Sequence, residues 1–171
     1  MSAKRAIIIT GKLVQDHEFI YPYYRLQEDG YIVDIATPDG EVTNGQIGAK
    51  IVPNKKTNEI ILGDYEILVL PGGAKCMEYL RQDKNTIEFI KNFYLTGKVI
   101  ASICHAAQLL ISAKIVNGKK ISGYYSIRDD IENAGASYVD EPVVIDKNII
   151  TTAHYKDLGI WMKTALSIAS K

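Results

Sequence analysis

The amino-acid sequence predicts an α/β fold with a mostly parallel central sheet, and three observations support that prediction. Short apolar runs with few charges recur along the chain, and a longer amphipathic segment follows most of them. Strands of this kind are typical of a sheet that is covered by helices on both faces, and their alternation with helices is typical of parallel pairing. Turn signals such as Pro38-Asp39-Gly40 and Pro71-Gly72-Gly73 end the apolar runs abruptly.

The elements follow from apolar periodicity and from the residues that begin and end them. Asp16 is a plausible N-cap for the first helix and Gly30 a plausible residue just beyond its end. We expect strands at residues 6–10, 31–37, 66–70 and 99–103, and a hairpin of 143–145 with 149–152 around Asp146-Lys147-Asn148. We expect helices at 16–29, 86–95, 106–113, 126–133 and 156–169, and a hairpin-like excursion at 42–52.

The composition indicates an ordinary globular protein, which we expect to form a single domain over residues 1–171. Twenty Lys plus Arg balance twenty Asp plus Glu, so nucleic acid and anionic membranes are not expected partners. The apolar runs are far shorter than a membrane helix, and the first residues lack a signal-peptide pattern. Two cysteines without CxxC spacing favour a reducing cytoplasm. No phosphate-binding or metal-ligand motif is present, so we expect no cofactor and no metal.

Cys104 is the predicted reactive centre. In parallel sheets, sites form beyond the carboxyl ends of the strands, which here are Thr10-Gly11, Pro71-Gly72-Gly73 and Ile103-Cys104-His105. A nucleophile elbow needs small residues two positions before and after the nucleophile, and Ser102 and Ala106 meet that condition. The N–H groups that begin the following helix should lower the pKa of the thiol, and His105 is a possible proton acceptor or positive charge.

Each of these features also has a purely structural interpretation. Cysteines are often small buried hydrophobes, but the elbow context favours a reactive Cys104, whereas Cys76 lacks that frame and is expected to pack. The glycines Gly72 and Gly73 terminate a strand, and their N–H groups are also suited to an oxyanion hole. A lone histidine such as His154 at a strand end is more often structural, so the choice between His105 and His154 as the partner of Cys104 stays open.

Five further segments form a recognisable pattern: residues 18–26 (EFIYPYYRL), 68–73 (LVLPGG), 101–105 (ASICH), 108–113 (QLLISA) and 133–136 (NAGA). Together they resemble the ThiJ/PfpI superfamily, which includes intracellular proteases of archaea and bacteria and the Parkinson's-linked protein deglycase. The resemblance covers nearly the whole chain.

The resemblance implies a flavodoxin-like α/β/α sandwich, related to class I glutamine amidotransferases, that assembles into homodimers or hexamers. It implies Cys104 as nucleophile, His105 as base and Glu78 as an orienting carboxylate donated by a neighbouring subunit. The N–H groups of Gly73 and His105 would then be the oxyanion donors, with Gly72, Gln15, Tyr124 and His154 lining the site.

The sequence departs from the superfamily pattern at three places. The glutamate usual in the first strand–helix loop aligns with Gln15, and the adjacent Asp16 and Glu18 are expected to point elsewhere. Ala106-Ala107 replaces the usual Gly-Pro, and Ala153-His154 replaces a Ser-Arg pair. Because glutamine cannot transfer a proton, we expect cofactor-free glyoxalase activity to be weak or absent.

Two functions are therefore expected. The first is a cysteine-dependent enzyme, an intracellular peptidase or protein deglycase, whose substrate is a peptide or small carbonyl compound. The alternative is a non-catalytic, redox- or stress-responsive or chaperone-like member that retains a reactive cysteine. Gln15 and the missing arginine favour the alternative, while Cys104, His105 and Glu78 favour the enzyme.

Overall fold

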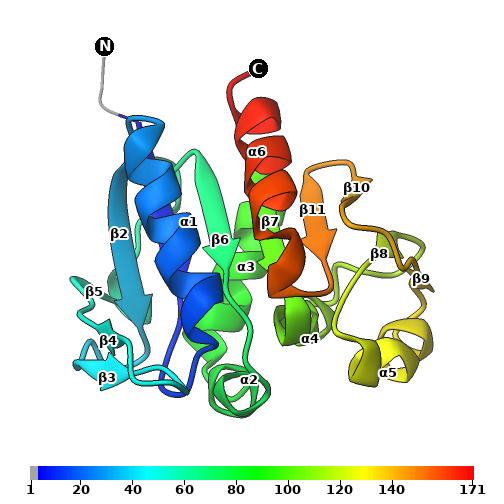
Figure 1. Cartoon of the computed structure of the whole chain (residues 1–171), viewed down its shortest axis with the longest axis horizontal. Coiled ribbons are helices and arrows are strands. Elements are labelled where there is room, and N and C mark those ends of the chain that lie inside the picture. The colour runs from blue at the N-terminus through cyan, green and yellow to red at the C-terminus, as the bar shows by residue number, and fades with distance from the viewer. Residues whose placement is uncertain (1–3) are drawn as a thin grey trace.

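The computed structural model describes residues 4–171, and its centre is a seven-stranded sheet (Figure 1). From edge to edge the strands are β10 (Val144–Asp146), β11 (Ile149–Thr152), β7 (Val99–Ile103), β6 (Ile67–Leu70), β1 (Arg5–Ile9), β2 (Ile32–Thr37) and β5 (Lys55–Lys56). Every neighbouring pair is parallel except β10 with β11, which form an antiparallel hairpin. The carboxyl ends of the parallel strands therefore share one edge of the sheet.

Helices cover both faces of the sheet, as the uncharged strands β6, β7 and β11 require. Figure 1 shows α1 (Asp16–Glu28) and α6 (Leu158–Ala169) in front of the sheet and α3 (Lys84–Leu95) behind it. The short helices α2 (Ala74–Leu80) and α4 (Ala107–Ser112) each follow the carboxyl end of a strand. Two small sheets lie outside the central one: the hairpin of β3 (Thr43–Asn44) with β4 (Lys50–Ile51), and the parallel pair of β8 (Lys120–Ile121) with β9 (Ser137–Tyr138). The remaining elements are the helix α5 (Arg128–Asn133) and 3₁₀ turns at Thr57–Glu59, Leu62–Asp64, Cys104–Ala106, Tyr125–Ile127 and Tyr155–Asp157.

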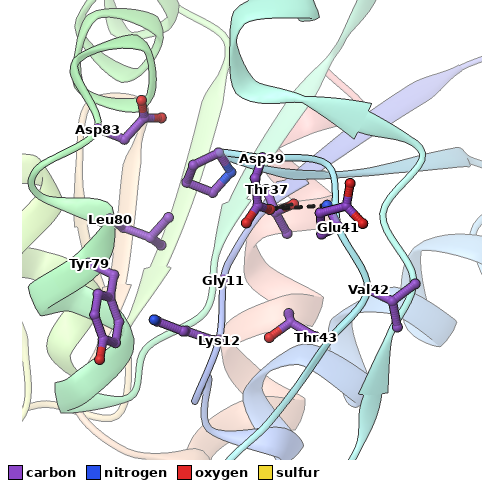
Figure 2. A pocket seen from close by; sticks show the side chains of 11 residues that line it. Gly11, Lys12, Thr37, Asp39, Glu41, Val42, Thr43, Tyr79, Leu80 and Asp83 are labelled. Atoms are coloured by element: carbon purple, nitrogen blue, oxygen red, sulfur yellow. Dashed lines mark hydrogen bonds between the residues drawn. The ribbon is translucent and has the colours of Figure 1, made fainter.

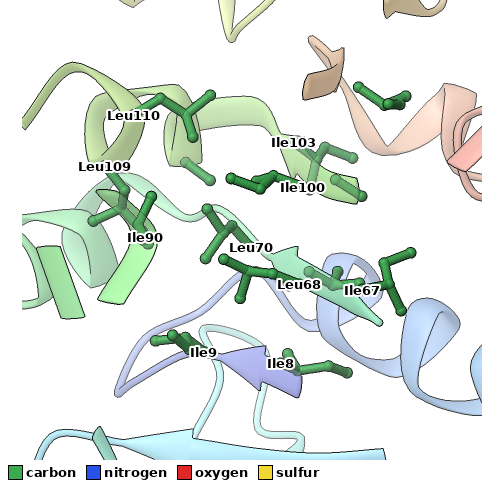
Figure 3. Packing of buried hydrophobic residues seen from close by; sticks show 14 of the residues in the cluster. Ile8, Ile9, Ile67, Leu68, Leu70, Ile90, Ile100, Ile103, Leu109 and Leu110 are labelled. Carbon is green, nitrogen blue, oxygen red and sulfur yellow. The ribbon is translucent and has the colours of Figure 1, made fainter. Parts of the chain in front are cut away.

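The core lies between the central strands and the two helical layers. All four residues of β6 and all five of β7 are buried, because both strands are covered on both faces. Figure 3 shows side chains of β1, β6 and β7 packed together with Ile90 of α3 and with Leu109 and Leu110 of α4. In α3, Phe89, Ile90 and Phe93 are buried, as expected for the apolar stripe of an amphipathic helix.

The predicted α/β class and flavodoxin-like sheet are confirmed, and the first four predicted strands lie within one residue of the observed ones. The predicted N-cap is wrong, because the side chain of Gln15, not Asp16, accepts from the N–H of Glu18. Asp16 instead accepts from the N–H groups of Ile47 and Ala49, at 2.8 and 2.6 Å, and so fastens the β3–β4 hairpin to α1. The helix α2, which follows the glycine pair directly, was not predicted from the sequence.

Among residues 4–171 no helix combines the length and the apolar character that crossing a bilayer requires.

Candidate active site

Three strand-end loops meet at the carboxyl edge of the sheet, because β1, β6 and β7 are neighbours there. The N–H of Gln15 donates to the carbonyl oxygen of Gly72 at 3.2 Å, which joins the first loop to the second. A Cβ atom on Gly72 would lie 2.8 Å from the carbonyl oxygen of Ile103, so the second loop packs directly on the third. The expectation that these loops are neighbours is confirmed.

Cys104 has the backbone geometry of a nucleophile elbow. Its φ of 61° is in the left-handed region, which residues other than glycine rarely adopt. The flanking Ser102 and Ala106 are fully buried, so larger side chains would not fit the turn. Strain of this kind persists where the surrounding structure enforces it, often at functional sites. The turn presents the sulfur to a cavity, although the Cys104 side chain is only 7% exposed.

That cavity has a volume of about 370 Å³, and no lysine or arginine among residues 4–171 lines it. Its lining residues are Gln15, Glu18, Gln46, Gly73, Ala74, Cys104, His105, Tyr124, His154 and Tyr155. Gln46, which sequence reasoning missed, comes from the β3–β4 hairpin, whose attachment to α1 through Asp16 makes it a wall of the site. A cavity lined by neither lysine nor arginine favours neutral ligands over carboxylates and phosphates.

A second cavity, of about 250 Å³, lies at the ends of β1 and β2 beside α2 (Figure 2). Figure 2 shows Lys12 beside Tyr79, with its Nζ atom 3.8 Å from the ring centre, and Asp39 bonded to the backbone of Glu41. In the described part of the chain, no cysteine or histidine lines this cavity. The nucleophilic chemistry therefore belongs to the cavity at Cys104.

Glu18 is the acid next to the thiol, so the prediction that it points elsewhere is wrong. It lies in the first turn of α1, is fully buried, and accepts from the N–H of Gly72 at 2.8 Å through Oε2. Its other oxygen, Oε1, forms no hydrogen bond with residues 4–171. The Cys104 thiol nevertheless lies close enough to influence the pKa of Glu18. Gln15 lines the cavity, but its side chain is bonded to His17 and to the N–H of Glu18.

The buried carboxyl and thiol shift each other's ionisation. Burial raises the pKa of Glu18 to about 7, against the opposing effects of the hydrogen bond from Gly72 and of the nearby Cys104 thiol. Burial also raises the pKa of the Cys104 thiol, and the Glu18 carboxylate raises it further, while the N–H groups of His105 and Gly73 lower it. The expected lowering of the thiol pKa is therefore not found, because burial and Glu18 outweigh the backbone dipoles. Proton transfer from the thiol needs a base inside the cavity.

His105 is placed to accept that proton. Its Nδ1 atom lies 3.3 Å from Sγ of Cys104, and its ring stacks on Tyr124 with centroids 4.8 Å apart. Burial lowers the pKa of His105, so the neutral imidazole, a base, is favoured. His154 lines the same cavity, but its Nδ1 accepts from the N–H of Lys156 at 3.2 Å. Of the two histidines that the sequence left open, His105 is the one in contact with the sulfur.

Glu78 does not reach the cavity within one chain. It lies on α2, its side chain is 62% exposed, and it pairs with Lys75 one turn away on the same helix. Cys76, on the same helix, is fully buried, and burial raises its pKa to about 12. Among the described residues, no three His, Cys, Asp or Glu side chains are grouped in a way that could hold a metal ion.

Gly72 is expected to tolerate no side chain. A Cβ atom there would lie 2.6 Å from Oε2 of Glu18 and 2.9 Å from Cβ of Cys104. We expect Gly72→Ala to lower the free energy of unfolding by about 1–3 kcal/mol through overpacking, and to slow alkylation of Cys104. Urea unfolding measures the first effect. Gly63→Ala, where a Cβ would meet nothing within 4 Å, is the matched control, and equal stability of the two variants would contradict the packing at Gly72.

Comparison with known proteins agrees with this geometry. The sequence model of the DJ-1/PfpI family matches residues 4–168. The chain belongs to the DJ-1/PfpI family. It is 36% identical over 159 residues to "Deglycase PfpI" of Pyrococcus furiosus, covering 93% of this chain and 95% of that protein. It is 35% identical over 171 residues to "Protein/nucleic acid deglycase 2" of Escherichia coli, covering 98% of each.

The DJ-1/PfpI fold is also found in solved structures. A two-domain protein of Anabaena variabilis, with DJ-1/ThiJ/PfpI-like and ferritin-like domains, superimposes with a TM-score of 0.95 at 32% identity. The match covers 98% of this chain and 48% of that protein, so this chain spans about half of its length. Relatives named as deglycases support enzyme activity in the DJ-1/PfpI family.

Proposed function

We propose that this protein is a cysteine-dependent enzyme of the deglycase or peptidase type, acting at a carbonyl carbon that is bonded or adjacent to an amine. The observation that carries the proposal is the convergence on one cavity of a strained Cys104, the buried acid Glu18 and the base His105. Two relatives named as deglycases, each matching nearly the whole chain, favour the deglycase reaction.

The arrangement supports a covalent mechanism. Sγ of Cys104 adds to the carbonyl carbon, and the thiol proton passes to Nδ1 of His105 or to Glu18. The carbonyl oxygen becomes an oxyanion, for which the N–H groups of Gly73 and His105, both near enough to the sulfur to lower the pKa of the thiol, are suitable donors. Where the amine is bonded to the attacked carbon, the oxyanion re-forms the carbonyl, and the amine takes up the transferred proton as its bond to that carbon breaks. Water then hydrolyses the resulting thioester and restores the thiol.

Glu18 removes the reason to expect weak glyoxalase activity. That expectation depended on Gln15 replacing the family's glutamate, whereas a carboxyl able to exchange protons near neutral pH lies beside Cys104. The same correction weakens the non-catalytic alternative, which retains only the replacement of an arginine by His154. The cavity is lined by neither lysine nor arginine, which favours neutral carbonyl substrates.

The decisive experiment is incubation of the protein with a peptide whose lysine or arginine carries a methylglyoxal adduct. We expect release of the unmodified peptide, and mass spectrometry should find a covalent adduct on Cys104 and none on the buried Cys76. Cys104→Ala, which lacks the proposed nucleophile, is the negative control. Release of the peptide at the same rate by this variant would refute the proposal.

A further inference from the structure

A serine side chain contacts the far nitrogen of the histidine that faces the thiol. Oγ of Ser126 lies 3.3 Å from Nε2 of His105, while Nδ1 of the same ring lies 3.3 Å from Sγ of Cys104. The imidazole therefore contacts the sulfur through one ring nitrogen and the hydroxyl through the other. We propose that Ser126 is the positioning residue of His105, holding the ring proton on Nε2 so that Nδ1 presents its lone pair to the thiol.

The backbone fixes Ser126 in this place. The N–H of Tyr124 donates to the carbonyl oxygen of Cys104 at 3.1 Å, so the segment that carries Ser126 is tied to the elbow itself. The N–H of Ile127 then donates to the carbonyl oxygen of Tyr124 at 3.0 Å and closes the 3₁₀ turn around Ser126. The ring of Tyr124 stacks on His105, which fixes the plane in which the imidazole meets the hydroxyl.

A hydroxyl differs from a carboxylate as the partner of a histidine. A carboxylate would stabilise the imidazolium and raise the pKa of the ring, whereas a neutral hydroxyl orients the ring without adding charge. Burial lowers the pKa of His105, and no charged group contributes to that shift. The neutral ring with its proton on Nε2 is the form that can accept the thiol proton at Nδ1. The other titratable groups lining the cavity are Glu18, Cys104, Tyr124, His154 and Tyr155.

This inference rests on the proposed function. It adds a third residue, from the same chain, to the pair of Cys104 and His105. Glu78, the carboxylate that the resemblance assigns to a neighbouring subunit, is paired with Lys75 and does not reach His105 within one chain. Nε2 has a single proton to donate, so Ser126 and a carboxylate from a second copy would compete for it.

The test uses full-length protein and two readouts that need no substrate. The ¹⁵N chemical shifts of the His105 ring report which nitrogen carries the proton, and the pH profile of iodoacetamide alkylation reports the reactivity of Cys104. We expect Ser126→Ala to produce a mixture of ring tautomers and to slow alkylation near neutral pH about 3- to 10-fold, the loss of one neutral hydrogen bond. Ser126→Thr keeps the hydroxyl and should show the wild-type tautomer and the wild-type alkylation rate. Ser126→Asp should raise the pKa of the His105 ring.

Ser126 is exposed, so these variants are not expected to unfold the protein. Unchanged tautomer and alkylation profile in Ser126→Ala would overturn the inference. So would a tautomer change in Glu78→Gln, because it would assign the ring partner to another subunit. Since neither readout involves turnover, lack of activity toward carbonyl substrates would count against the proposed function and leave the role of Ser126 standing.

Discussion

Replacing Glu18 with glutamine is expected to lower turnover of a carbonyl substrate by on the order of 10²- to 10⁴-fold, the usual contribution of a positioned acid–base group. Glutamine retains an oxygen that can accept from the N–H of Gly72, so the shape of the site should survive. It cannot exchange a proton with the thiol. Steady-state rates with methylglyoxal and with a glycated peptide measure the effect.

Gln15 provides the matched control for that experiment. It lines the same cavity, but its side chain is bonded to His17 and to the N–H of Glu18 and not to the thiol. Gln15→Ala removes a helix-cap hydrogen bond and a contact with the cavity but no group that exchanges a proton, so it should lose far less activity than Glu18→Gln. The assignment fails if Gln15→Ala loses as much activity as Glu18→Gln.

The stability of the protein should fall as the pH rises through the neutral range. The pKa of Glu18 is about 7 in the folded protein against an ordinary value of 4.5, so between those values the folded state binds more protons than the unfolded state. Stability from this group is complete below about pH 4.5 and is lost as the pH rises through 7. Integrated over that interval, the change in the free energy of unfolding is about 3 kcal/mol.

Urea unfolding of wild type and Glu18→Gln at about pH 4.5 and about pH 8 isolates this contribution. Relative to wild type, the variant should become more stable by about 3 kcal/mol at the higher pH. Glu88→Gln, at an exposed position of α3, controls for the loss of a carboxylate. A stability difference between wild type and Glu18→Gln that does not change with pH would show that the Glu18 carboxyl titrates normally.

Local pattern was sufficient to predict the elbow and its neighbours. The small residues Ser102 and Ala106 around Cys104 describe a turn whose geometry depends on adjacent residues alone. The alternation of apolar strands with helices likewise predicts that the strand-end loops share one edge of the sheet, because parallel strands place their carboxyl ends together. The ionisation of the thiol was not predictable in this way, because it depends on burial and on a carboxyl more than eighty positions away in the chain.

Glu18 was not predicted as a site residue, although its position on one face of the first helix carries a signal. It precedes Pro22 by four residues and Leu26 by eight, and both of these are buried. A helical period therefore places Glu18 on the apolar stripe of α1, where an unpaired glutamate is costly and indicates a function. Ser126 had no such signal, since its role depends on how the segment after Gly123 folds back on Cys104.

The hydrogen bond between Gly72 and Glu18, together with the nearby thiol, has an electrostatic consequence for the reaction. When Cys104 gives its proton to Glu18, a buried anion on oxygen is exchanged for a buried anion on sulfur, and the total charge of the interior is unchanged. Forming the Cys104 thiolate therefore adds no new ion to the poorly polarisable interior. Adding such an ion would otherwise be the largest electrostatic cost of ionising a buried thiol.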